Sequence, residues 1–304
     1  MTDQVAIRTE GLTKHYGDVK ALVDLDLSVE RGEIFGFLGP NGAGKTTMIR
    51  TILDEIRPTS GTASIVGLDS HSDSVEIRSY IGYVPGDLAL YPNLTGKDTI
   101  TYFANLRDGV DWSYVDELAD RLDADLSKKV GDLSSGNRQK VGLIQAFMNR
   151  PDVLIMDEPS SGLDPLMQRE FQALLREVIA NGSTVFLSSH TLSEVQRVAD
   201  RVGIIRHGKL IALETVASLR SKGIRSVELF FDSPVDAAVF ESLPGVRDVA
   251  VQNHHVTLSF SGQMETLLKT VTERYTLLDI STQEADLEEI FLTYYRDDAN
   301  DVVN

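Results

Sequence analysis

The sequence predicts an α/β core over residues 1–220 and a small α+β domain over residues 221–304. Two observations lead to this prediction. In the first part, short apolar runs typical of buried strands alternate with amphipathic helical patterns. In the second part, shorter elements follow the order strand, helix, strand, strand, helix, strand. A chain of 304 residues is long enough to build a core in each domain.

The composition is that of an acidic globular protein without cysteine. The net charge of −17 comes from 46 acidic and 29 basic residues; 28 of the acids are aspartate and only 10 of the bases are lysine. This charge disfavours nucleic acid binding and suits the salty cytoplasm of a halophile, although acidity for solubility alone is the alternative. Without cysteine the chain has no disulfides or thiolate metal sites, which fits a cytoplasmic protein. We expect no membrane span and no signal peptide.

The N-terminal region predicts antiparallel strands at residues 5–9 and 21–29, with a turn-rich segment at residues 11–17 between them. Tyr16 belongs to this segment. Its ring either stacks on an adenine base or packs against a neighbouring strand, and this stretch alone favours neither.

The glycine-rich loop at residues 39–47 is the strongest functional signal. It follows the apolar run 33–38, precedes a helical pattern and fits G-x-x-x-x-G-K-[ST]. Glycines let backbone N–H groups surround an anion, and a helix N-terminus favours phosphate. Lys45 would add charge at the β- and γ-phosphates, and Thr46 a hydroxyl for Mg²⁺. The expected nucleotide contacts are Gly39, Pro40, Asn41, Gly42, Ala43, Gly44, Lys45, Thr46 and Thr47.

A helical insertion interrupts the α/β pattern after a predicted strand at residues 63–67. Residues 88–150 carry three helical patterns, which cover residues 97–106, 113–122 and 135–148. We interpret this stretch as a helical subdomain.

Two carboxylates end the next apolar strand, at residues 153–157. A fully apolar strand of this length is typical of the centre of a parallel sheet, and ligands bind at the carboxyl ends of such strands. Asp157 would hold Mg²⁺, directly or through water, and Glu158 would orient or deprotonate an attacking water. The alternative, that Asp157 and Glu158 are only solvated acids at a strand end, is less favoured next to a phosphate-binding loop.

The rest of the core continues the alternation. A buried strand at residues 183–189 ends at His190, which could contact a γ-phosphate, although a lone histidine is more often structural. The other predicted elements are helices at residues 166–179 and 192–199 and a hairpin across residues 207–208.

The C-terminal domain predicts a ferredoxin-like layer of sheet and helices. Its expected strands lie at residues 226–231, 246–251, 255–260 and 275–280, and its helices at residues 235–243 and 264–274. A last helix at residues 286–295 and an unstructured acidic tail from residue 297 would follow. We do not expect His254 and His255 to bind a metal, because adjacent residues in a strand point apart.

Together these motifs resemble the ATP-binding subunit of an ABC transporter over about residues 5–220. The family's signature motif matches residues 133–137, its second Walker motif matches residues 153–158, and its D-loop matches residues 161–164. The resemblance implies that Tyr16 is the aromatic residue that stacks on adenine and that His190 is the switch histidine. It also implies an ABC-type P-loop core with an antiparallel β subdomain and a helical subdomain.

The sequence departs from the family pattern at two places. In the signature, Ser135 and Asn137 replace a glycine and a glutamine, whereas Ser134 and Gly136 match the pattern. Where the family usually has a glutamine after residues 83–85, this chain has Gly86 followed by Asp87. Either Asp87 substitutes as a metal ligand or the backbone serves instead, and we favour Asp87.

The resemblance implies the catalytic subunit of an exporter of the ABC-2 type, in which the membrane-spanning permease is a separate chain. ATP and Mg²⁺ would be its cofactors, and two copies would form a head-to-tail dimer around two ATP molecules on the inner face of the cell membrane. The catalytic residues would be Lys45, Glu158 and His190. The metal ligands would be Thr46, Asp157 and Asp87. The implied contacts of the dimer with ATP also include Ser134, Ser135, Gly136, Asn137 and Asp164. The alternatives are a soluble ABC ATPase without a membrane partner and a regulatory module with weak catalysis.

Overall fold

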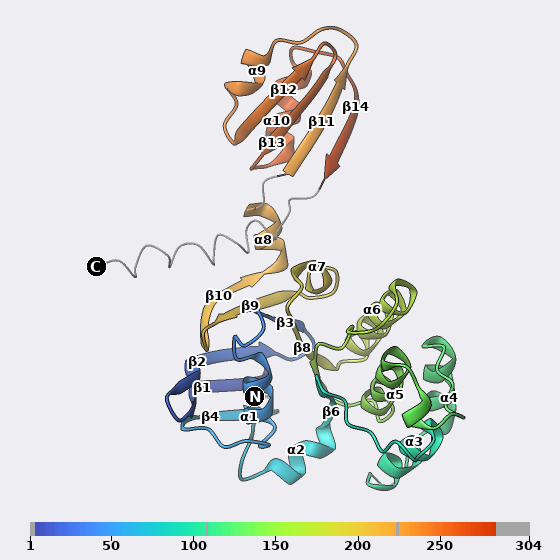
Figure 1. The fold of residues 1–304 in the computed structure, drawn as a ribbon. Coiled ribbons are helices and arrows are strands. Elements are labelled where there is room, and N and C mark those ends of the chain that lie inside the picture. Colours follow the sequence, from blue (N-terminus) through green and yellow to red (C-terminus); the bar gives the residue numbers. More distant parts are fainter. Residues whose placement is uncertain (1–3, 108, 223–224, 284–304) are drawn as a thin grey trace. The chain divides into compact units, whose positions relative to one another are not determined.

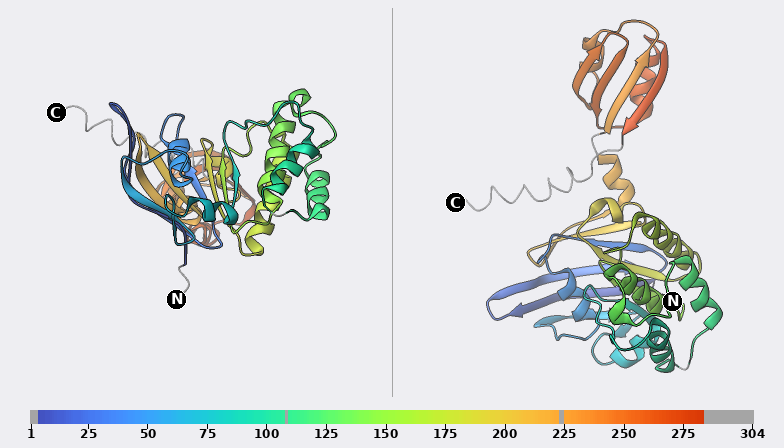
Figure 2. Two further views of the ribbon diagram at one scale, coloured as in Figure 1. Left: turned by 90° about the horizontal axis from the view of Figure 1, so that it is seen from below. Right: turned by 45° about the vertical axis from the view of Figure 1, so that its right-hand side comes forward.

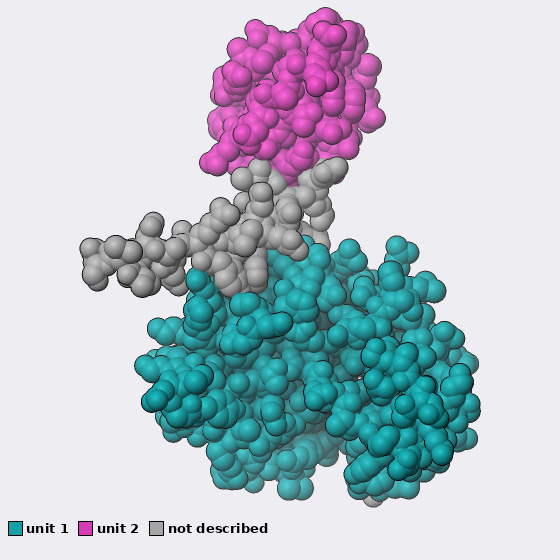
Figure 3. All heavy atoms as spheres, viewed as in Figure 1, with its two compact units in different colours: residues 1–213 teal, residues 214–304 magenta. Residues whose placement is uncertain are grey.

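The computed structural model describes residues 4–107, 109–222 and 225–283. The chain divides into two compact units, Met1–Leu213 and Glu214–Asn304, which Figure 3 colours separately. The expected boundary, after residue 220, lies inside helix α8 (Val216–Lys222), whereas the boundary between the two units lies before this helix. Within the described residues, every helix is too short or too polar to cross a bilayer.

The centre of the first unit is a six-stranded sheet in the order β10-β9-β3-β8-β7-β6. Strand β3 pairs in parallel with β8 and β9, and β7 pairs in parallel with β6 and β8. Every residue of β3, β7 and β8 is buried, as their apolar runs predicted. The strand bounds are β3 (Ile34–Leu38), β6 (Ile81–Val84), β7 (Val153–Asp157), β8 (Thr184–Ser189), β9 (Arg201–Arg206) and β10 (Lys209–Thr215).

A second sheet, in the order β2-β1-β4-β5, contains the N-terminal strands. These are β1 (Val5–Tyr16), β2 (Val19–Glu30), β4 (Ser60–Ile65) and β5 (Leu68–Asp69). The expected turn at residues 11–17 is wrong, because β1 continues to Tyr16. A register shift between Thr9 and Leu12 lets the strand pass Gly11, whose φ is 55°, and Leu12 beyond it is fully buried.

The helices of the first unit gather mainly on one side of the central sheet. In Figures 1 and 2, α3, α4, α5 and α6 lie together, on the side opposite the second sheet. Helix α1 instead packs in one apolar core with strands of both sheets, through Met48 and Ile49. The helix bounds are α1 (Lys45–Ile52), α2 (Ser74–Tyr80), α3 (Gly96–Asn105), α4 (Trp112–Arg121), α5 (Ser135–Phe147), α6 (Pro165–Ala180) and α7 (Leu192–Val195), with a 3-10 turn at Val130–Asp132.

Helix α7 is much shorter than the predicted helix at residues 192–199. The chain turns after Val195 because it must return to the sheet next to β3. Asp200 completes this return: its backbone N–H donates to the carbonyl of Ile34, and its Oδ2 atom accepts from the backbone N–H of the same residue at 2.9 Å.

The second unit confirms the ferredoxin-like prediction. Its sheet has the order β12-β13-β11-β14, and the strand pairs are antiparallel. The elements are β11 (Arg225–Phe231), α9 (Ala237–Glu241), β12 (Val246–Gln252), β13 (His255–Phe260), α10 (Met264–Thr272) and β14 (Leu277–Gln283). The helix predicted at residues 286–295 and the tail lie outside the described residues. His255 stacks on Phe230 with ring centres 4.4 Å apart, and the described residues contain no cluster of three metal-binding side chains.

Candidate functional site

The glycine-rich loop connects β3 to α1 and holds Lys45 close to its own backbone. Lys45 is 6% exposed, and its Nζ atom donates to the carbonyl of Gly39 at 2.7 Å and to that of Pro40 at 3.3 Å. A Cβ on Gly39 would lie 2.5 Å from the carbonyl oxygen of Ile205, so no larger residue fits there. Gly44, just before α1, has a φ of 114°, which side chains disfavour. The loop is therefore shaped by contacts that only glycine allows.

The C-terminal end of β7 adds a buried carboxylate to this loop. Asp157 is 2% exposed; its Oδ2 atom accepts from Thr46 Oγ1 at 2.6 Å, and its Oδ1 atom accepts from Ser188 Oγ. Gly86 lies next to the same carboxylate, where a Cβ would be 3.0 Å from Asp157 Oδ2. Thr46 and Asp157 thus offer hard oxygen atoms next to each other, the ligand type that Mg²⁺ prefers.

Glu158 links Lys45 to His190. One oxygen of its carboxylate, Oε1, lies 3.4 Å from Lys45 Nζ, and the other, Oε2, lies 2.5 Å from His190 Nδ1. Glu158 has a φ of 50°, unusual for a residue with a side chain, and its N–H donates to the carbonyl of Ser188 at 3.2 Å. Its backbone therefore leaves the sheet sharply, and the ends of β3, β7 and β8 bring three charged or ionisable side chains together.

The signature residues form the N-terminus of α5. Ser134 caps this helix and accepts from the N–H of Asn137 at 3.2 Å, while Ser135 is exposed. Gly136 touches the following motif: a Cβ there would be 2.4 Å from the carbonyl oxygen of Gly162. Asp164 caps α6 by accepting from two backbone N–H groups. The signature and the D-loop are therefore packed against each other within one chain.

Among the described residues, the signature makes no hydrogen bond or ion pair with the phosphate-binding loop of its own chain. In Figures 1 and 2, α1 and α5 lie on opposite sides of β6. Among the described residues, neither Tyr16 nor Asp87 makes a hydrogen bond, an ion pair or a ring contact with the loop. Tyr16 ends β1 at 48% exposure with Lys14 Nζ 5.0 Å from its ring centre, and Asp87 is exposed.

Sequence reasoning missed two polar contacts that shape the site. Ser188, a buried strand residue, donates to Asp157. Gln139, buried on α5, donates from Nε2 to the carbonyl of Pro159 at 2.9 Å and so ties the signature helix to the turn after Glu158. In the sequence, the only sign of these two contacts was that Ser188 and Gln139 are polar residues within apolar patterns.

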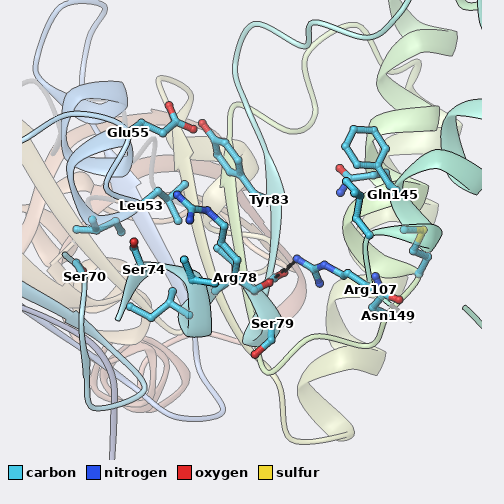
Figure 4. Close-up of a pocket in the computed structure, with 17 residues that line it drawn as sticks. Leu53, Glu55, Ser70, Ser74, Arg78, Ser79, Tyr83, Arg107, Gln145 and Asn149 are labelled. Carbon is cyan, nitrogen blue, oxygen red and sulfur yellow. Dashed lines mark hydrogen bonds between the residues drawn. The ribbon is translucent and has the colours of Figure 1, made fainter. Parts of the chain in front are cut away.

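A cleft of about 850 Å³ opens between α2 and β6 on one side and α3 and α5 on the other (Figure 4). Arg107 crosses it from the end of α3, and its Nη2 atom donates to the carbonyls of Arg78 and Ile81 at 2.6 and 2.7 Å. Burial lowers the pKa of Arg107 and raises the pKa of the Tyr83 hydroxyl. Asn149 Nδ2 and Ser70 Oγ, which also line the cleft, are buried without a hydrogen-bond partner among the described residues.

The chain is similar to known proteins over most of its length. Residues 22–161 match the family model described as ABC transporter. The bacitracin transport ATP-binding protein BcrA of Enterococcus faecalis is 32% identical, over 96% of this chain and 96% of that protein. The BcrA protein of Bacillus licheniformis is 34% identical, over 94% of this chain and 96% of that protein. The daunorubicin resistance ATP-binding protein DrrA3 of Streptomyces coeruleorubidus is 37% identical, over 71% of this chain and 70% of that protein.

Solved structures resemble a large part of the chain. An ATP-binding subunit of an ABC transporter superimposes with a TM-score of 0.65 at 30% identity, over 71% of this chain and 92% of the other. A dimeric ATP-binding cassette in a post-hydrolysis state with ADP and phosphate superimposes with a TM-score of 0.64, over 69% of this chain and 98% of the other. Its identity of 23% makes this a likeness of fold.

Proposed function

The chain belongs to the ATP-binding subunits of ABC transporters, and from this premise we propose that it hydrolyses ATP to drive a membrane exporter. The observation that carries the proposal is the link from Lys45 through Glu158 to His190, beside the Thr46–Asp157 pair. Phosphoryl transfer to water needs groups that hold the phosphates, a base or orienting group for the water, and stabilisation of the charge that develops. In this proposal, residues at the start of α1 and just beyond β7 and β8 supply all of these.

Each side chain has a distinct role in this proposal. The loop N–H groups and Lys45 bind the β- and γ-phosphates, for which Lys45 gives up part of its contact with Glu158. Thr46 and Asp157 hold Mg²⁺, which supplies charge neutralisation at the phosphates when bound. Glu158 accepts a proton from the attacking water or orients it, and His190 holds the Glu158 carboxylate in place.

The phosphate-binding loop supplies only one side of a nucleotide site. Ser134 is exposed and caps α5, and the first N–H groups of a helix favour an anion. We propose that a second copy of the chain brings its signature, Ser134 to Asn137, to this loop, so that two ATP molecules lie between the copies. Such a head-to-tail pair is an isologous dimer. Tyr16 and Asp164 would complete the nucleotide contacts, and Asp87 remains a candidate ligand of Mg²⁺.

The relatives named for bacitracin transport and daunorubicin resistance support an export complex. We propose that a separate permease chain docks in the cleft beside α3 and α5, which would hold the protein on the inner face of the membrane. The cleft is lined by both apolar and polar side chains, and the exposed Val75 and Leu106 on its walls suit the apolar face of a partner. The transported compound is a property of that partner.

The decisive experiment compares Glu158→Gln with the wild-type protein. Loss of a general base reduces the rate by about 10² to 10⁴-fold, whereas the isosteric amide leaves ATP binding intact. Glu158→Gln should therefore form a stable dimer with ATP and Mg²⁺, measured by size-exclusion chromatography, without hydrolysing it. The matched control is Glu273→Gln, an exposed acid in the second unit, which should keep the wild-type rate. A wild-type protein that binds ATP but never turns it over would favour the regulatory module instead.

A further inference from the structure

One carboxylate joins the two loops that carry Glu158 and His190. Glu194 lies on α7, and its Oε2 atom accepts from Ser160 Oγ at 2.7 Å. It also lies 3.3 Å from Ser189 Oγ, whose single proton is shared between this carboxylate and the carbonyl of Thr191 at the same distance. Ser160 comes two residues after Glu158, and Ser189 directly precedes His190. We infer that Glu194 is a positioning residue that sets the Glu158–His190 contact. This inference rests on the proposed hydrolysis of ATP.

The sheet alone cannot set that contact. The pairing of β7 with β8 ends at Asp157 and Ser188, so Glu158 and His190 both stand beyond it. The N–H of Glu158 still donates to the carbonyl of Ser188, but the chain then turns away through the positive φ of Glu158. Beyond the end of the β7–β8 pairing, Glu194 connects the two loops through its hydrogen bonds.

The surroundings of Glu194 make this connection stiff. The carboxylate is partly buried and Ser189 is only 3% exposed, so bulk water replaces their hydrogen bond poorly. Hydrogen bonds to an ionised acceptor are stronger than those between neutral groups. Ser189 Oγ in turn accepts from the N–H of Thr191 at 2.9 Å, which closes a tight turn around His190.

The Glu194 carboxylate is also connected to the signature, through the turn that follows Ser160. Ser160 begins the turn that contains Gly162, and Gly162 lies against Gly136 of the signature helix. A cavity of about 20 Å³, room for one water, lies beside Ser160 and Glu194. Removal of the carboxylate would widen this cavity and free the turn. Glu194 therefore ties the hydrolytic side chains to the segment through which a second copy would act.

The test compares Glu194→Ala, Glu194→Gln and the control Ser193→Ala in steady-state ATP hydrolysis. Ser193 is the exposed neighbour on the same helix. Glu194→Ala should lower kcat by about tenfold and change the KM for ATP by less than about twofold, because Lys45 and Thr46 are untouched. Glu194→Gln keeps an oxygen that accepts from both serines, so it should recover most of kcat. Ser160→Ala added to Glu194→Ala should lower kcat little further.

The outcomes separate this inference from the proposed function. If Glu194→Ala turns over like the wild type, or Glu194→Gln is as slow as Glu194→Ala, Glu194 does not position the site, while hydrolysis by the wild type still stands. If Glu194→Ala instead melts early and loses ATP binding, its role is structural and the inference is refuted. If the wild type does not hydrolyse ATP, the proposed function fails and the inference fails with it.

Discussion

Gly136 lies so close to the backbone of Gly162 that one added methyl group should disturb the signature. In Gly136→Ala, the new Cβ would stand 2.4 Å from the carbonyl oxygen of Gly162. Contacts below 3.0 Å essentially do not occur for a Cβ, so something must move. The obstacle is backbone rather than a flexible side chain, which means that the D-loop turn must shift against α5.

Two opposing effects set the size of the change. Overpacking costs about 1–3 kcal/mol, whereas alanine in place of glycine near the start of a helix recovers up to about 1 kcal/mol. The free energy of unfolding should therefore fall by about 1–2 kcal/mol. For a unit the size of Met1–Leu213, each kcal/mol lowers the melting temperature by about 2–4 °C, so we expect a decrease of about 2–8 °C.

Differential scanning calorimetry of Gly136→Ala and of a control on the same helix measures this effect. The control is Gly142→Ala, whose Cβ would have its nearest contact, at 2.6 Å, with Cδ2 of the Leu88 side chain, and a rotamer change can relieve that contact. Gly136→Ala should be the less stable variant, and it should also impair ATP-dependent dimerisation, because Ser134 moves with the helix. The reasoning is refuted if Gly136→Ala melts at or above the wild-type temperature, or if Gly142→Ala is the more damaging change.

Two further predictions concern charge. The excess of acidic over basic residues, 46 against 29, should make added KCl raise the melting temperature, because salt screens the self-repulsion; an unchanged melting temperature between dilute buffer and molar KCl would contradict this. The second concerns Asp125, whose pKa is lowered from 3.8 to about 2, chiefly by a hydrogen bond from the Ser127 hydroxyl. The resulting stabilisation is complete above pH 3.8 and is lost as the pH falls through 2, so the difference in urea midpoint between wild type and Asp125→Ala should be constant near neutral pH and shrink between pH 4 and 2.

Local patterns sufficed for much of the fold. The apolar runs at β3, β7 and β8 had no polar face, which is typical of strands buried on both sides, and the structure has them in the middle of a parallel sheet. The order of elements in the second unit was likewise enough to predict its topology. The errors fall where tertiary contacts override local preference. Strand β1 runs through a predicted turn because Leu12 is buried, and α7 ends early because Asp200 pairs with Ile34.

The chemistry available to this protein follows from local features of its sequence. A loop that only glycine can form, a lysine and a threonine at a helix N-terminus, and carboxylates at a strand end each follow from backbone and charge preferences that act over a few residues. Which of these groups come into contact depends on the packing of distant segments. The contacts of Glu158 with Lys45 and His190, and that of Glu194 with Ser160, join segments that the parallel sheet brings side by side. No local pattern encodes such contacts, because crossover connections separate neighbouring parallel strands in the sequence.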